Sequence, residues 1–153
     1  MPLRWYTQTW SELSKENLYK ILSLRAEVFV VEQDCPYLDT DDKDKKATHI
    51  LAYDDETLIG YARIFLHNNP CVIGRVVVKA THRGKSIGKM LMKKSICEVP
   101  EENPIFISAQ EHLKRFYESL GFTQTEKGYL EDGIPHIPMI LPPRSANNLK
   151  ART

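Results

Sequence analysis

The sequence predicts a single mixed α/β domain with one central sheet and helices around it. Segments with helical spacing of apolar residues alternate with short runs rich in β-branched residues, in the order helix, three strands, helix, strand, helix, two strands. The chain has 153 residues, which fits one domain of ordinary size. Hydrophobic residues make up 42% and charged residues 27%, which excludes a disordered chain, a collagen-like fibre and a coiled coil.

The charge balance and the cysteines narrow the function classes. The net charge is +1, whereas proteins that coat nucleic acid or an anionic membrane need a strong basic excess, so we expect neither partner. The longest apolar runs, such as 28–31, are too short to cross a bilayer, and no leader peptide is apparent. Cys35, Cys71 and Cys97 are too widely spaced for a zinc site or a disulfide framework. We therefore expect a cytoplasmic protein without a metal.

A helix is predicted over residues 14–29, because apolar residues recur there at three- and four-residue steps and Ser14 can cap it. Arg25 falls on the apolar stripe, where it forms either a buried ion pair or a ligand contact. Residues 39–46 form a charged loop. Because this loop lacks the glycine and the final glutamate of a calcium-binding EF-hand loop, we expect a solvated turn.

Three strands are predicted next. Residues 49–53 and 58–66 are strand-like and are separated by 54–57, which suits a hairpin turn. Residues 71–79 are dense in valine and isoleucine, which is typical of a strand covered on both faces.

The following elements are a helix over 87–99, a short buried strand over 105–108 and a helix over 111–120. Gly121 stands where a helix favours a left-handed last residue.

Residues 122–125 and 134–141 are predicted to close the sheet as a pair of strands around the connection 127–133. Residues 142–153 then form a polar tail that we expect to be loose, so the domain spans 1–141.

The turn between the strand that ends at Val78 and the next helix predicts an anion site. Cations in the first turns of a helix repel the positive end of its dipole unless an anion lies between them, and glycine lets that anion approach the backbone. This favours a phosphate or pyrophosphate site over a turn with packing glycines and solvated lysines. The spacing fits neither the P-loop nor the dinucleotide fingerprint. The residues concerned are Arg83, Gly84, Lys85, Gly88 and Lys89.

Two motifs carry a family resemblance. Arg83-x-x-Ser86-x-Gly88, after a valine-rich strand, resembles the acetyl-CoA motif [RQ]-x-x-G-x-[GA] of the GNAT acetyltransferase superfamily. Residues 116–122, FYESLGF, resemble the second hallmark of that superfamily. Further segments resemble its ElaA-like branch, and the resemblance covers about residues 3–141. These segments are 25–33, 60–64, 73–76 and 133–136.

The sequence departs from the motif at one position, because Ser86 stands where the family has glycine. Since this position falls inside the start of the helix, we expect no left-handed backbone there. The serine hydroxyl would then be available to a phosphate.

The resemblance implies an open, mostly antiparallel central sheet flanked by helices, in which the central strands splay apart. The pantetheine arm of acetyl-CoA, the implied cosubstrate, would lie between the strand that ends near Val78 and strand 105–108. Gln110 would steady this arm. The implied cofactor contacts are Val76, Val77, Val78, Arg83, Gly84, Lys85, Ser86, Ile87, Gly88, Lys89, Gln110 and Phe116.

The resemblance also implies a reaction, the transfer of an acetyl group to a primary amine of a small molecule or peptide by direct attack in a ternary complex. Tyr117 matches the general acid of the family, and the backbone N–H near Val76 or Val77 matches its oxyanion donor. The base is left open between Glu32, His136 and His112, or a water that relays the proton.

Several alternatives concern the acceptor and the class of protein. Arg25 and Arg63 are candidate acceptor anchors, which would suit a substrate with a carboxylate. A CoA-binding sensor without turnover is the alternative to an enzyme. A cysteine hydrolase using Cys35 or Cys71 is disfavoured, because no nucleophile motif surrounds either residue. The sequence is compatible with a homodimer.

Overall fold

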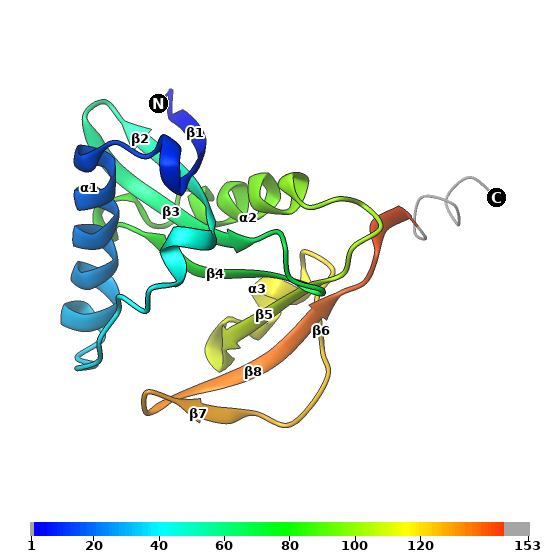
Figure 1. Ribbon diagram of the computed structural model, residues 1–153. Coiled ribbons are helices and arrows are strands. Elements are labelled where there is room, and N and C mark those ends of the chain that lie inside the picture. The colour runs from blue at the N-terminus through cyan, green and yellow to red at the C-terminus, as the bar shows by residue number, and fades with distance from the viewer. Residues whose placement is uncertain (1, 146–153) are drawn as a thin grey trace.

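One open sheet with helices on both faces makes up the protein (Figure 1). The computed structural model describes residues 2–145. The helices are α1 (Lys15–Arg25), α2 (Ile87–Glu98) and α3 (Lys114–Glu118). The strands are β1 (Arg4–Thr9), β2 (Thr48–Asp54), β3 (Thr57–Phe65), β4 (Cys71–Val78), β5 (Ile105–Gln110), β6 (Thr123–Gln124), β7 (Tyr129–Glu131) and β8 (Ile134–Leu141).

The eight strands lie in the order β1-β2-β3-β4-β5-β8-β6, with β7 paired to β8 outside this path. All pairs are antiparallel except β4 with β5, so the predicted mixed, mostly antiparallel sheet is confirmed. The sequence pattern missed β1 and β7. Neither strand has a buried residue, so neither shows the apolar alternation that marks a strand.

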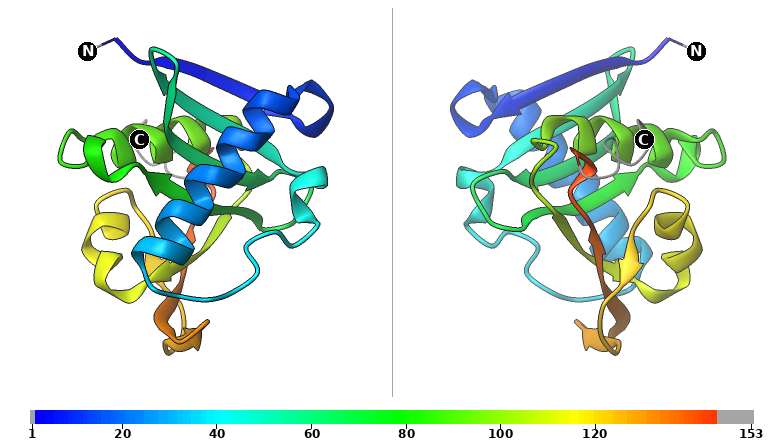
Figure 2. Two further views of the ribbon diagram at one scale, coloured as in Figure 1. Left: turned by 90° about the vertical axis from the view of Figure 1, so that its left-hand side faces the viewer. Right: turned by 90° about the vertical axis from the view of Figure 1, so that its right-hand side faces the viewer.

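The two long helices cover opposite faces of the sheet (Figure 2). On one face α1 buries Ile21 and Leu24 against Leu51 and Tyr61. The α2 face carries the larger core, which also takes in the residues around α3. Its most buried members include Ile59, Ile64, Ile87, Leu91, Ile105, Phe122 and Met139. The described residues contain no helix that is both long and apolar enough to cross a membrane.

Helix α1 starts where the sequence predicts and ends earlier. The Ser14 hydroxyl accepts from the backbone N–H of Asn17 at 3.0 Å, which is the predicted cap. The α-helix ends at Arg25 and continues as a wider π-helical stretch, Ala26–Glu32, in which Gln33 N–H donates to the Val28 carbonyl at 3.1 Å. Such wide turns occur often at functional sites, because they rotate the following side chains out of helical register.

Strands β4 and β5 splay apart, as the resemblance implied. They pair only at Cys71–Ile105 and Val72–Phe106. The β3–β4 register changes from Arg63 opposite Gly74 to Tyr61 opposite Val77, so two β4 residues stand opposite one β3 residue. This is a β-bulge, which bends a strand locally. Beyond the bulge β4 leaves β5, and a gap opens between them.

The charged loop 39–46 is not the solvated turn that the sequence predicts. Asp39 and Asp44 are only 8% and 6% exposed. The wholly buried Arg25 donates through Nε to Asp39 and through Nη1 to Asp44, both at 2.7 Å. A buried guanidinium needs carboxylate partners, and this loop supplies them.

Two further arginines extend this cluster. Arg63 donates to both carboxylate oxygens of Asp41 at 2.9 Å and to Asp44 at 3.0 Å. Arg75 donates to the Asp39 carboxylate at 2.9 Å and to its carbonyl at 3.0 Å. We call Arg25, Arg63, Arg75, Asp39, Asp41 and Asp44 the arginine–aspartate network.

The C-terminal part holds two differences from the predicted elements. The helix over 111–120 is a 3₁₀ turn, Glu111–Leu113, followed by the short α3. Gly121 has the predicted left-handed backbone, with φ of 101°. The start of the predicted tail is held in place, because Arg144 donates to the carbonyls of Ile96 and Val99 at the end of α2. Residues 146–153 lie outside the described residues.

Replacing Arg25 tests the network. Arg25→Met is expected to lower the free energy of unfolding by about 3–5 kcal/mol, because it leaves two buried carboxylates without their cation. Urea denaturation at pH 7 measures this loss. Arg4→Met, which removes an exposed guanidinium, is the matched control and should change stability little. A loss of similar size in both variants would contradict the role of the network.

Candidate active site

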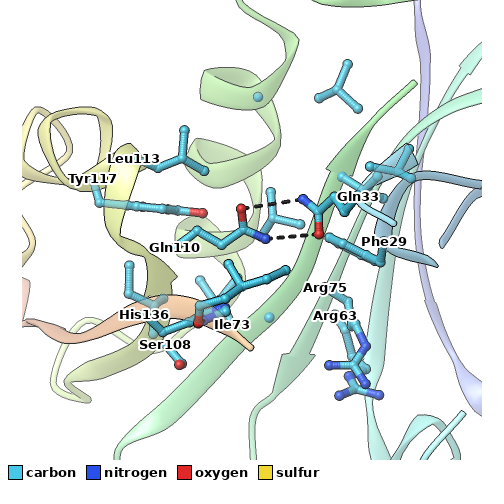
Figure 3. Close-up of a pocket in the computed structure, with 18 of the residues that line it drawn as sticks. Phe29, Gln33, Arg63, Ile73, Arg75, Ser108, Gln110, Leu113, Tyr117 and His136 are labelled. Carbon is cyan, nitrogen blue, oxygen red and sulfur yellow. Dashed lines mark hydrogen bonds between the residues drawn. The ribbon is translucent and has the colours of Figure 1, made fainter. Parts of the chain in front are cut away.

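A groove with a cavity volume of about 1140 Å³ opens where β4 and β5 diverge (Figure 3). The π-helical stretch and β4 form one wall, the start of α2 lies at one end, and β5, α3 and β8 form the other wall. Of the residues that the sequence predicts for the site, Lys85 and Arg25 do not line this groove. Those that do are Glu32, Arg63, Val76, Val77, Val78, Arg83, Gly84, Ser86, Ile87, Gly88, Lys89, Gln110, His112, Phe116, Tyr117 and His136.

The turn before α2 has the properties of an anion site. Gly84 has φ of 79°, and a Cβ there would meet no atom within 4 Å, so the position needs glycine for its backbone angle. The first turn of α2 has no acidic residue, and Ser86 makes no side-chain cap. The N–H groups of this turn therefore face the groove with no carboxylate cap, beside Arg83 and Lys89.

The prediction for Ser86 was wrong. Ser86 has φ of 61° and ψ of 19°, which is the left-handed conformation. The residue stands just before α2 and not inside it, so the backbone must turn there in a way that suits glycine. A serine in this conformation is strained by roughly 1–2 kcal/mol. The left-handed backbone at this position explains why the family motif has glycine there, and this chain keeps that backbone with a serine.

The arginine of this turn, Arg83, is bound to the carboxylate of Glu32. Arg83 donates to both oxygens of Glu32 at 2.5 and 2.9 Å, while its Nε donates to the Val78 carbonyl. The hydrogen bonds from Arg83 lower the pKa of Glu32 below its ordinary value. Glu32, a candidate base, is thus an ionised partner of Arg83, which the sequence predicts to bind an anion.

Tyr117 stands at the gap between the splayed strands. Its ring packs edge-on against Phe116 and Phe122 and leaves the residue 8% exposed. Its hydroxyl points into the groove (Figure 3) and has no hydrogen-bond partner among residues 2–145. Burial raises the pKa of Tyr117 to about 12, so the phenol stays protonated at neutral pH.

His136 presents one ring nitrogen to the groove. Its Nδ1 lies 2.7 Å from the Ile134 carbonyl, and because a carbonyl only accepts, Nδ1 carries the proton. Its other ring nitrogen, Nε2, lies 3.4 Å from a carboxylate oxygen of Glu131. The ring stacks on Tyr129, whose hydroxyl bonds Ser108.

Two glutamines bridge the groove. Gln110 at the end of β5 and Gln33 after the π-helical stretch exchange two amide hydrogen bonds at 3.3 and 3.4 Å (Figure 3). The pair separates the end with Tyr117 and the α2 turn from the end with Arg63, Arg75, Ser108 and His136 (Figure 3). The glutamine pair thus divides the groove into an end beside α2 and a polar end, which we call the chamber.

The two predicted acceptor anchors are bound within the protein. Arg25 is wholly buried and does not line the groove, so of the two readings left open for it the buried ion pair is the one observed. Arg63 lines the groove, but its Nη1 and Nη2 both donate to aspartates of the network.

Sequence reasoning missed four residues of this chamber: Gln33, Arg75, Ser108 and Glu131. Arg75 falls within segment 73–76, one of the segments that carry the resemblance, but no local pattern assigns it a role. Among the described residues no group of three histidine, cysteine, aspartate or glutamate side chains could hold a metal ion.

Comparison with known proteins gives the family. The model of the acetyltransferase (GNAT) domain matches residues 11–142. The ElaA protein of Escherichia coli is 43% identical over 145 residues, which cover 90% of this chain and 95% of ElaA. This chain belongs to the GNAT acetyltransferase family.

Solved structures agree with the GNAT assignment. The crystal structure of Escherichia coli ElaA has a TM-score of 0.86 at 41% identity, covering 91% of this chain and 99% of that one. An acyl-CoA N-acyltransferase from Pseudomonas aeruginosa has the same TM-score and coverage at 38% identity. The PaiA N-acetyltransferase of Thermoplasma acidophilum, solved in complex with coenzyme A, shares the fold alone, with a TM-score of 0.67 at 16% identity over 93% of this chain and 99% of that one.

The strain at Ser86 in this GNAT domain leads to a prediction. Ser86→Gly is expected to raise the free energy of unfolding by about 0.5–1 kcal/mol, because glycine adopts the left-handed backbone without a steric cost. Urea denaturation measures the gain. Ser86→Ala keeps the Cβ and removes only the hydroxyl, so it should give no gain. Equal effects of the two variants would show that the hydroxyl, and not the backbone angle, sets the stability.

Proposed function

We propose that this GNAT domain is an acetyl-CoA-dependent N-acetyltransferase that acetylates a primary amine of a small molecule or peptide by direct attack in a ternary complex. One observation carries the proposal. The protonated hydroxyl of Tyr117 points into the groove where β4 and β5 separate, and no residue of 2–145 binds it. A buried proton donor at such a gap suits a reaction whose leaving group needs a proton.

The groove fits acetyl-CoA. The first-turn N–H groups of α2, with Arg83 and Lys89, suit the pyrophosphate. When the pyrophosphate binds, it would replace Glu32 as the partner of Arg83. The pantetheine arm would lie between β4 and β5 beyond their last pair, Val72–Phe106. Coenzyme A in the Thermoplasma acidophilum relative supports this class of cofactor. When bound, acetyl-CoA would supply an activated thioester.

The residues of this chain would move two protons. The amine attacks the thioester carbon, so a C–N bond forms while the C–S bond breaks, and the amine loses one proton. The departing thiolate takes a proton from Tyr117, and the tyrosinate regains a proton from solvent when CoA leaves. Because a free thiol has an ordinary pKa near 8.5, below that of Tyr117, this transfer is uphill on its own and would have to be coupled to the breaking of the C–S bond. The backbone N–H near Val76 or Val77 would donate to the oxygen on which negative charge develops.

His136 is a better candidate base than Glu32, and His112, which also lines the groove, stays a third candidate. His136 lines the chamber, and its Nδ1 is bound to the Ile134 carbonyl, so Nε2 is the nitrogen that would take the proton of the amine. Glu32 accepts from Arg83, which lowers its pKa and weakens it as a base. We assign Glu32 to the cofactor turn and His136 to the acceptor. A cytoplasmic setting and a homodimer remain predictions from the sequence.

The anion site is tested with Gly84→Asp. The variant is expected to weaken acetyl-CoA binding by at least about tenfold, because it puts a carboxylate beside the pyrophosphate. Isothermal titration calorimetry with acetyl-CoA measures the affinity. Gly84→Ala carries the same backbone strain without the charge and should lose much less. Equal affinities of Gly84→Asp and the wild type would contradict the cofactor turn.

The enzyme is tested with Tyr117→Phe and an acceptor screen that follows free CoA over amines, amino acids, peptides and polyamines. Tyr117→Phe is expected to lower kcat by roughly 10²- to 10⁴-fold with unchanged acetyl-CoA affinity, because only the proton donor is removed. Tyr19→Phe, on the exposed face of α1, is the matched control. Tight acetyl-CoA binding by the wild type without turnover of any acceptor would favour the sensor.

A further inference from the structure

The arginine–aspartate network is polarised toward the groove. Its three arginines and three aspartates balance in number, but more of the arginines than of the aspartates line the groove. Asp39 and Asp44 are nearly buried and do not line the groove. The charged groups that line this wall, together with neighbouring Lys43, are three cations and one anion: Lys43, Arg63, Arg75 and Asp41. A ligand in the chamber therefore meets a locally cationic wall.

Arg75 is the arginine of this wall whose guanidinium keeps N–H groups without an acceptor among the described residues. Its side chain is 23% exposed, against 5% for Arg63 and 0% for Arg25. Its Nε and Nη2 donate to Asp39, and no residue of 2–145 accepts from its Nη1. The guanidinium lies beside that of Arg63 at the chamber end of the groove (Figure 3). Through Nη2 it also lies 3.5 Å from a carboxylate oxygen of Asp41. These contacts use the Nε and Nη2 edge, so the N–H groups of Nη1 can bind a further carboxylate.

The backbone aims Arg75 at this position. Arg75 stands in the β4 bulge and has φ of 50°, an uncommon angle for a residue with a side chain. Bulges re-aim side chains and occur often beside active sites. Asp39 and the ring of Tyr37, 5.8 Å from the guanidinium, hold the side chain in this direction. The bulge that opens the gap between β4 and β5 thus also places a cation beside it.

The opposite wall of the chamber is negative. Glu131 and Asp132 line it, and Ser108 and His136 lie beside Glu131. A ligand with an ammonium group at one end and a carboxylate at the other matches this separation of charge. The ammonium end would face Glu131 and the base His136, and the carboxylate end would face Arg75.

We propose that the acceptor is a small primary amine that carries a carboxylate, of the amino-acid class, and that Arg75 selects it by donating from Nη1 to that carboxylate. This rests on the proposed acetyltransferase function and names its substrate class. Arg75 takes the place of Arg25 and Arg63, the anchors that the sequence predicts.

The wild-type protein tests the class directly. With saturating acetyl-CoA, CoA release is followed for the nineteen standard amino acids that have a primary amine, each as the free acid and as its carboxamide. At least one acid should exceed its carboxamide by about tenfold or more in kcat/KM, the discrimination of one good ionic hydrogen bond. The less basic amine of the carboxamide is more often unprotonated, so chemistry alone would favour the carboxamide. Equal or better use of every carboxamide would overturn the proposal and favour peptide or polyamine acceptors.

Variants of Arg75 then assign the selection. In Arg75→Gln the ratio of acid to carboxamide should fall to near 1, and in Arg75→Lys it should lie in between. Because the ratio compares two substrates on one variant, it does not depend on how much of the protein folds. Arg115→Gln, an exposed arginine outside the groove, should keep the wild-type ratio. An unchanged ratio in Arg75→Gln would overturn the role of Arg75.

Thermal shift separates this inference from the proposed function. With CoA present, the free acids, and not their carboxamides, should raise the Tm of the wild type and leave that of Arg75→Gln unchanged. That result without CoA release would contradict the acetyltransferase and keep the carboxylate site. Turnover with equal use of acids and carboxamides would support the acetyltransferase and contradict the carboxylate site. No shift and no turnover with any compound would overturn both.

Discussion

The buried guanidinium of Arg25 is the constraint on which the acceptor side of this GNAT domain depends. Its charge cannot be buried alone, so it requires Asp39 and Asp44 from the loop that follows α1. These bonds hold the loop down on the sheet, where Asp44 also meets Arg63 of β3 and Asp39 meets Arg75 of β4. Ion pairs between side chains thereby join α1, the loop after it, β3 and β4. These ion pairs tie the β4 wall of the groove to α1 and to the loop after it.

The bulge in β4 serves two ends. It turns the strand away from β5 after only two paired residues and so opens the gap that a cofactor arm requires. It also holds Arg75 in a left-handed backbone conformation, next to that gap. Strain of this kind persists where surrounding contacts over-determine the position. Here those contacts are the bonds to Asp39, so the network and the bulge support each other.

Charge organises the groove along its length. At the end near α2, Glu32 accepts from Arg83 and so neutralises the arginine of the turn before that helix. In the chamber the carboxylates of the network lie behind their arginines, and the acidic side chains face them from β7 and the turn after it. The near-zero net charge of the whole chain thus says nothing of this groove, where groups of opposite sign face one another. The glutamine pair marks the boundary between the two ends.

Local pattern in the sequence determined most of the elements, the Ser14 cap, the left-handed Gly121 and the motif turn with its cations. These features depend on residues a few positions apart, and their periodicity or turn chemistry is visible in the chain. Strands β1 and β7 have no buried face and so carry no such signal. Only the tertiary structure decided the rest. Arg25 meets aspartates 14 and 19 residues away, and Glu32 meets an arginine 51 residues away, so no local rule pairs them. The angles at Ser86 and Arg75 are likewise set by the path of the chain through the fold, which is why the sequence predicted the wrong conformation for the first and no role for the second.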